Sequence, residues 1–302
     1  MQNFINMVNI QAVLFIYLAI GVFARKMKII GSEALQSFIN YIINIALPCM
    51  IFNSFALDMS RERLLSALFV LAVSFAICLL SWILGKLLYR RVPDDQRGIM
   101  QYGTLISNAG FAGLPLVEGA FGPEALFYAS VFLIPSRIFM WSTGISLFTT
   151  ASLRTKIKSV LLNPGIIAVV LGLFQMILQV PLHPILSKAL LNIGNSTSSL
   201  SIIVVGAILA EVPIRTVLEK NVLILSFVRL ILIPGIVLIV LKAMGTPLLI
   251  TASCVLLTGM PCGSTTALLA QKYGANYQFA SKCVFVSTVL SLITAPLLAL
   301  FL

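Results

Sequence analysis

Long apolar stretches alternate with short polar breaks along the whole chain. Each stretch reaches or approaches the roughly 20 residues that an α-helix needs to cross the hydrocarbon core of a bilayer. The pattern predicts ten transmembrane helices joined by short connections, with no soluble domain between them. The predicted spans cover residues 7–24, 34–56, 65–89, 97–119, 124–150, 161–180, 184–210, 217–243, 247–271 and 276–301.

The two halves of the chain carry related features in the same order. In each half, a span interrupted by glycine and proline leads through an aromatic–glycine turn, Phe121-Gly122 or Tyr273-Gly274, to an aromatic–Ala–Ser segment. Because five spans per half is an odd number, the second copy must enter the membrane in the opposite direction. We therefore predict an all-α integral membrane protein made of two inverted five-helix repeats, residues 1–150 and 151–302, which form one membrane domain.

The fourth and ninth predicted spans are interrupted near their middle. Proline removes a backbone donor, and glycine lets the chain leave helical geometry. In lipid, the freed N–H and C=O groups must be covered by protein or by a water-filled cavity. Paired breaks in two related halves therefore predict a substrate site near the bilayer midplane. The candidate binding residues at the breaks are Asn108, Gly110, Gly113, Pro115, Gly259, Pro261, Gly263, Ser264 and Thr265.

The chemistry expected at these breaks is anion binding. A half-helix that begins at a break presents free N–H groups and the positive end of its dipole, so it binds an anion without a dedicated cation. The alternative is that the breaks are packing kinks, since Gly and Pro are common in membrane helices. Polar segments in spans two and seven either line the cavity or join helices by hydrogen bonds. Their candidate residues are Asn44, Pro48, Asn53, Asn195 and Ser196.

Two arginines fall in the middle of predicted spans, Arg137 in the fifth and Arg229 in the eighth. A cation buried in the membrane is costly and is a functional candidate by default. Because no aspartate or glutamate lies at similar depth in the sequence, an unpaired cation beside a cavity favours an anionic substrate. The alternative is that each arginine donates to carbonyls freed by a neighbouring proline or extends to an interface. Arg137 is counted among the candidate substrate-binding residues, and the role of Arg229 stays open.

Composition agrees with a membrane protein, since 60% of the residues are hydrophobic and only 10% are charged. The net charge of +11 does not indicate nucleic-acid binding, because the basic residues form short clusters between apolar stretches rather than a basic domain. If the N-terminus is outside, thirteen lysines and arginines fall in cytoplasmic connections and four in outer ones. This asymmetry predicts that both termini lie on the extracytoplasmic side of the cell membrane.

The chain offers no cofactor or metal site and lacks the residues of an intramembrane enzyme. The five cysteines fall in apolar stretches without CxxC spacing, which favours buried free thiols. The only histidine, His183, lies in a predicted outer turn, and the spans hold no pair of aspartates. Serine, aspartyl and zinc hydrolases all need residues of these kinds inside the membrane.

Two segments resemble signatures of the auxin efflux carrier family: residues 44–52, NIALPCMIF, and residues 107–115, SNAGFAGLP. The compact ten-span layout resembles the bacterial members, in a plasma or inner membrane, more than the plant PIN exporters. The resemblance covers essentially the whole chain. It implies secondary transport of organic anions such as malate, malonate or auxin. It also implies crossed, broken helices four and nine, in a scaffold similar to that of bile-acid symporters and sodium/proton antiporters.

The same resemblance implies roles for individual residues. In the PIN exporters an asparagine at the crossover contacts the substrate carboxylate, and Asn108 matches it, while Pro115 and Pro261 match the crossover prolines. Span three here lacks the carboxylate of the PIN polar site, so the resemblance leaves coupling to H⁺ or to Na⁺ open. A homodimer is expected by family analogy.

The function expected from the sequence is a secondary active transporter that moves a small organic anion by alternating access. Its other partners are the lipid bilayer and a coupling ion. The alternative is an anion channel or a membrane sensor built on a transporter-like fold. Substrate-saturable exchange distinguishes a carrier from a channel.

Overall fold

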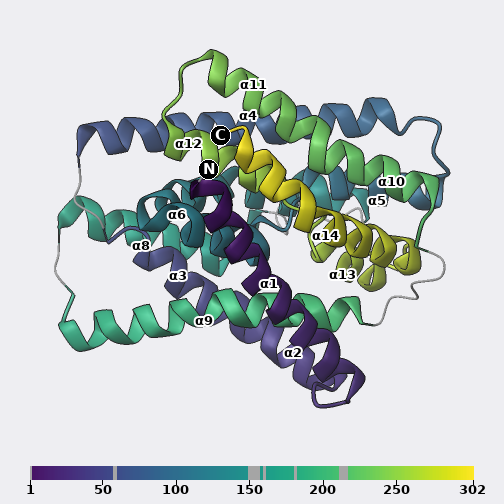
Figure 1. Cartoon of the computed structure of the whole chain (residues 1–302), viewed down its shortest axis with the longest axis horizontal. Helices are drawn as coiled ribbons and strands as arrows, with labels where there is room; N and C mark the ends of the chain where they lie inside the picture. Colours follow the sequence, from purple (N-terminus) through teal and green to yellow (C-terminus); the bar gives the residue numbers. More distant parts are fainter. Residues whose placement is uncertain (1, 57–59, 149–156, 159–160, 180–181, 211–216) are drawn as a thin grey trace.

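The computed structural model describes residues 2–56, 60–148, 157–158, 161–179, 182–210 and 217–302 (Figure 1). Within these residues the secondary structure is helical, and the one β-type pairing is an isolated bridge between Ser107 and Cys262. The predicted all-helical architecture is confirmed. The predicted boundary between the halves at residues 150 and 151, and most of the basic connector 151–160, lie outside the described residues.

The helices follow the apolar stretches of the sequence. They are α1 (Gln2–Lys26), α2 (Ser32–Tyr41), α3 (Leu47–Asn53), α4 (Arg61–Leu88), α5 (Asp94–Leu105), α6 (Leu114–Phe139), α8 (Pro164–Leu178), α9 (Pro184–Leu209), α10 (Lys220–Phe227), α11 (Ile233–Ala243), α12 (Leu248–Thr258), α13 (Thr265–Lys272) and α14 (Tyr277–Leu300). Wider π-helical turns continue several of them: η1 (Ile42–Ala46), η2 (Ala109–Gly113), η3 (Met140–Gly144) and η6 (Val228–Leu232).

Six helical stretches are long and apolar enough to cross a membrane, which supports a multi-pass membrane protein. They are Ser32–Asn53, Arg61–Leu88, Ala109–Gly144, Pro184–Leu209, Lys220–Ala243 and Tyr277–Leu300, and two shorter apolar helices are Pro164–Leu178 and Leu248–Thr258. The third stretch is two helices joined at Gly122, where φ is 81° and ψ is −173°. Only glycine adopts this geometry readily, so the predicted break between spans four and five lies at that residue.

Several helices begin at the polar residues that the sequence places before them. The side chains of Ser60, Asn163 and Asn276 accept hydrogen bonds from the first-turn N–H groups of α4, α8 and α14. Capping of this kind supplies partners for N–H groups that have none within the helix. The five cysteines are free, as predicted, and four of them are buried.

The helices pack in two groups. In the first, called here the α1–α9 group (α1, α2, α3, α8 and α9), α1 packs along α9 and α3 contacts both α8 and α9. In the second, the α6–α14 group (α4, α5, α6 and α10 to α14), α4 and α12 pack on α6, and α10 and α13 pack on α14. Figure 1 shows α4 and α9 along opposite borders of the molecule, with the interrupted helices between them.

Candidate functional site

The two interrupted helices meet at their breaks. In Figure 1, α5 and α13 lie on the right and α6 and α12 on the left, so each broken helix has one half on either side of the centre. Between the halves, the N–H of Asn108 donates to the carbonyl of Pro261 at 2.8 Å, and the N–H of Gly263 donates to the carbonyl of Ile106 at 3.0 Å. These antiparallel bonds join the two extended segments into a crossover.

Side chains satisfy other backbone groups that the breaks set free. The hydroxyl of Ser201 on α9 donates to the carbonyl of Phe111 at 2.8 Å, and that of Ser107 donates to the carbonyl of Leu257 at 3.1 Å. The N–H of Cys262 donates to the hydroxyl of Ser287 at 3.1 Å. Non-helical backbone inside a membrane is tolerated when protein groups cover it in this way.

Arg229 covers two further carbonyls at the crossover. Its side chain is only 2% exposed. Its Nε donates to the carbonyl of Met260 at 3.1 Å and its Nη1 to that of Thr104 at 2.8 Å. Arg229 therefore donates to carbonyls at the helix breaks, although those carbonyls belong to α5 and to the segment after α12 rather than to its own helix.

A cavity of about 420 Å³ lies beside the crossover, between the two helix groups. The α1–α9 group contributes residues of α2, η1, α3 and the start of α8, and the α6–α14 group contributes both breaks and the end of α6. Six of the predicted site residues line the cavity: Asn108, Gly110, Arg137, Gly263, Ser264 and Thr265. The breaks and the mid-span arginine, separate in the sequence, therefore meet at one hollow.

Arg137 places its guanidinium against the start of the half-helix η2–α6. A Cβ built on Gly110 would lie 2.6 Å from Nη2 of Arg137, so only glycine admits the guanidinium at this distance. The hydrogen bond found for Arg137 among the described residues is a weak one, from Nη1 to the sulfur of Met140 at 3.6 Å. Most of the donors of this guanidinium are therefore left for a ligand.

Three more polar atoms at the cavity are buried without a partner among the described residues. They are Nδ2 of Asn108, Oγ of Ser264 and Nε1 of Trp141. Asn108 and Ser264 are 4% and 3% exposed. A buried donor without a partner is destabilising. Together with Arg137 and the first N–H groups of η2–α6 and α13, these atoms form a donor-rich surface suited to an anion.

Other predicted residues lie away from this cavity. Asn44 is exposed, and its Nδ2 donates to the carbonyl of Asn40 in its own helix at 2.8 Å. Ser196 likewise donates to the carbonyl of Ile193 at 2.7 Å. Asn53, in α3 with Pro48, faces α9, where a Cβ on Gly194 would lie 3.1 Å from its Nδ2. These predicted residues therefore bond within their own helices or pack against a neighbouring one, and other residues of span two line the cavity instead.

The remaining predicted residues lie at or beyond the crossover. A Cβ on Gly113 would lie 2.6 Å from a methyl of Leu257, and one on Gly259 would lie 2.6 Å from a methyl of Leu298, so both glycines allow close helix packing. Pro115 and Asn195 line an open groove of about 470 Å³ on a different part of the surface, together with Glu118.

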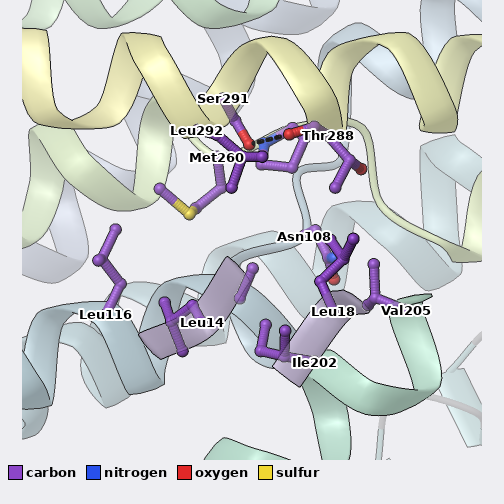
Figure 2. Close-up of a pocket in the computed structure, with 12 residues that line it drawn as sticks. Leu14, Leu18, Asn108, Leu116, Ile202, Val205, Met260, Thr288, Ser291 and Leu292 are labelled. Carbon is purple, nitrogen blue, oxygen red and sulfur yellow. Dashed lines mark hydrogen bonds between the residues drawn. The ribbon is translucent and has the colours of Figure 1, made fainter. Parts of the chain in front are cut away.

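A second, small cavity of about 40 Å³ lies across the crossover from the large one (Figure 2). Asn108 and Pro261 line it from the crossover, and Thr288 and Ser291 line it from α14. Figure 2 shows apolar side chains lining it, among them Leu14 and Leu18 of α1, Leu116 of α6, and Ile202 and Val205 of α9. Asn108 contributes to both cavities and therefore stands at the partition between them.

Comparison with known proteins identifies the family. The sequence profile of the family described as membrane transport protein matches residues 7–160 and 148–299, which together are nearly the whole chain. The chain belongs to this membrane transport protein family. The resemblance to auxin efflux carriers inferred from the sequence is thereby confirmed.

Two archaeal relatives of this membrane transport protein are themselves named as uncharacterized transporters. The one from Methanocaldococcus jannaschii is 24% identical over 305 residues, which cover 96% of each chain. The one from Methanothermobacter thermautotrophicus is 26% identical over 290 residues, which cover 92% of each chain. Both support a transporter, and neither name states a substrate.

Some residues at the transport protein's cavity were missed in the sequence. Trp141 follows Arg137 by four positions, so the two share a helix face, and this spacing was a usable signal. Asn40 precedes the predicted Asn44 by four positions, but sequence spacing alone does not show which of the two faces the cavity. Asn163, which the sequence analysis did not single out, caps α8 and also lines the cavity.

Proposed function

We propose that this membrane transport protein is a secondary carrier for a small organic anion, which binds in the large cavity at the crossover. The observation that carries the proposal is the set of unpaired donors from Asn108, Ser264 and Trp141 beside Arg137. No described aspartate or glutamate lines this cavity. A carboxylate supplies the acceptors that these donors lack, and charge-assisted hydrogen bonds to it are the stronger kind.

The charge at the cavity favours a dicarboxylate over a monocarboxylate. Each of the two helix N-termini contributes roughly +0.5 elementary charge, and with the guanidinium of Arg137 the total is about +2. Two carboxylates balance this charge, whereas one leaves about half of it uncompensated. Malate and malonate are therefore better first probes than an auxin-like monocarboxylic acid.

The positions of the cavities support alternating access. Both the large and the small cavity lie on the seam between the α1–α9 and α6–α14 groups. The large one holds the donors, and the small one is lined mainly by apolar side chains. Rocking of one group against the other opens the second path as the first closes, with the anion held at the crossover. The distribution of basic connections supports an opening of the large cavity on the cytoplasmic side and both termini outside.

An inverted repeat of ten spans accounts for the paired features of the site. Gly122 and Gly274, which end the two corresponding segments, both have positive φ, 81° and 69°. Each follows a half-helix that begins at a break, η2–α6 in the first half and α13 in the second. The two copies thereby supply one donor-bearing helix start each.

A thermal-shift screen of small mono- and dicarboxylates on the purified protein tests the proposed function. A dicarboxylate should raise Tm saturably, because a ligand stabilises the state that it binds. Asn108→Ala should weaken the apparent affinity about five- to tenfold, the effect of one buried hydrogen bond. Asn44→Ala, an exposed asparagine away from the cavity, is the matched control and should bind as the wild type does. The proposal fails if no carboxylate shifts Tm or if Asn108→Ala binds normally.

Counterflow in proteoliposomes separates a carrier from an anion channel. A carrier preloaded with unlabelled dicarboxylate accumulates labelled dicarboxylate transiently and saturably. A channel passes the label without counterflow. The small volume of this second cavity and the mainly apolar side chains that line it support the carrier, because an open anion channel needs a wider polar path through the crossover.

A further inference from the structure

The crossover has a negative side as well as a positive one. α5 and α12 both end there, with Ile106 and Gly259 at their C-caps. A helix C-terminus presents carbonyls without helical partners and roughly −0.5 elementary charge. In transporters with broken helices, coupling cations bind at such C-terminal ends and at unwound carbonyls. The same position in this protein therefore requires a cation.

A side chain of the protein supplies that cation. Arg229 is 2% exposed and donates to the carbonyl of Thr104 at the end of α5 and to that of Met260 just after α12. No described carboxylate forms an ion pair with it. The two helix ends, at roughly −0.5 each, balance its single positive charge. Backbone carbonyls alone therefore explain how this arginine is buried without an acidic partner.

The neighbouring carbonyls are already engaged by protein donors. Four of them accept hydrogen bonds from the backbone N–H groups of Ile106, Gly259 and Gly263 and from the hydroxyl of Ser107: the carbonyls of Tyr102, Val255, Ile106 and Leu257. The carbonyl of Gly103 accepts from the thiol of Cys262 at 3.6 Å. A sodium ion at this point would have to displace such bonds, since ions in membrane sites exchange their water shell for carbonyl oxygens.

We propose that Arg229 is the built-in cation of the crossover, occupying the position at the ends of α5 and α12 that a sodium ion would otherwise fill. It neutralises the negative helix ends, so the positive ends and Arg137 act on the anion undiminished. Anion binding at the crossover is therefore independent of sodium. This last step rests on the proposed function, whereas the charge balance around Arg229 does not.

The test measures Tm of the purified full-length protein in sodium chloride and in choline chloride of equal concentration, without any carboxylate. The wild type should melt at the same temperature in both salts. In choline chloride, Arg229→Ala should have a Tm several degrees below that of the wild type. Adding sodium or millimolar guanidinium should restore part of this loss in Tm, because either cation can enter the emptied position. Arg229→Lys keeps the charge, so its Tm should lie between those of the wild type and Arg229→Ala. Arg91→Gln, which removes an exposed arginine from a connection, should behave as the wild type does.

Two results overturn the proposal. One is a wild-type Tm that rises saturably with sodium relative to choline, which means that a sodium ion binds the native protein. The other is an Arg229→Ala protein whose Tm does not fall, or whose lowered Tm is unaffected by sodium and guanidinium. Either outcome would mean that Arg229 supplies packing rather than charge. If Arg229→Ala does not fold, the wild-type comparison and Arg229→Lys still decide. Failure of the carboxylate screen leaves these outcomes unchanged, so the two proposals fail separately.

Discussion

At the scale of single residues, the two membrane arginines have opposite surroundings. Arg229 lies at the C-terminal ends of two half-helices and donates to their carbonyls. Arg137 lies at the N-terminal start of another, beside Gly110, with only a sulfur contact among the described residues. One arginine has its charge balanced within the fold, and the other adds charge of the same sign as the helix end beside it. This difference favours Arg137, rather than Arg229, as the arginine that binds the proposed anion.

Arg137→Gln should weaken dicarboxylate binding about ten- to hundredfold, because it removes a charge-assisted hydrogen bond worth about 1.5–3 kcal/mol. The measurement is ligand-dependent thermal shift or calorimetry on the purified variant. Arg91→Gln, at an exposed position in a connection, is the matched control and should bind normally. An unchanged affinity in Arg137→Gln would show that this guanidinium serves the fold rather than the ligand.

How far the site was predictable is also decided residue by residue. Asn108, Ser264 and the glycines next to them were predicted as candidates because breaks in apolar spans are visible in the sequence. Trp141 was missed because an aromatic residue inside an apolar span faces lipid, another helix or a cavity, and the sequence does not show which. Asn44 was included but lies outside the cavity. It sits within the π-helical turn η1, whose wider winding changes the angle between successive residues, so a 3.6-residue period misplaces its side chain.

At the scale of helices, the sequence predicted the breaks but not the glycines that join α1 to α9. A Cβ on Gly21 would lie 2.0 Å from the carbonyl oxygen of Ile203, and one on Gly206 would lie 2.1 Å from that of Leu18. The two backbones are therefore in direct contact, as small residues allow in membranes. These glycines were unremarkable in the sequence because close contact depends on which helix lies opposite.

Gly206→Ala should lower Tm by several degrees, because the added methyl meets backbone atoms that cannot move aside. Overpacking of this kind costs about 1–3 kcal/mol. Gly235→Ala in α11 is the matched control: nothing lies within 4 Å of its added Cβ, and alanine is the better helix former. It should melt at the wild-type temperature or above. Equal melting of the two variants would mean that α1 and α9 are not in direct backbone contact.

At the scale of the whole molecule, the sequence did not predict how the helices divide into two groups or where the seam between the groups lies. Span order gives no direct information on which helices pack together, because lipid-facing and partner-facing surfaces are both apolar. The seam is what the proposed carrier mechanism depends on, since Asn108 lines both the large cavity and the small one.

Thiol labelling in oriented membrane vesicles tests which end of the seam is open. The background carries Cys49→Ala, because Cys49 is the one cysteine that is not buried. Thr265→Cys lies in the large cavity, and Met244→Cys lies at an exposed residue that ends α11, in the turn before α12. A charged, membrane-impermeant reagent should label Thr265→Cys from the cytoplasmic side and Met244→Cys from the outer side, as the positive-inside rule places them.

A bound dicarboxylate should slow the labelling of Thr265→Cys, because it occupies the cavity that the reagent must enter, and should leave Met244→Cys unaffected. Labelling of both positions from the same side would refute the assigned orientation of the spans. Equal labelling of Thr265→Cys from both sides in the absence of ligand would refute a barrier of apolar side chains around the small cavity. In that case Asn108 would line a continuous path, and the crossover would belong to a channel rather than to a carrier.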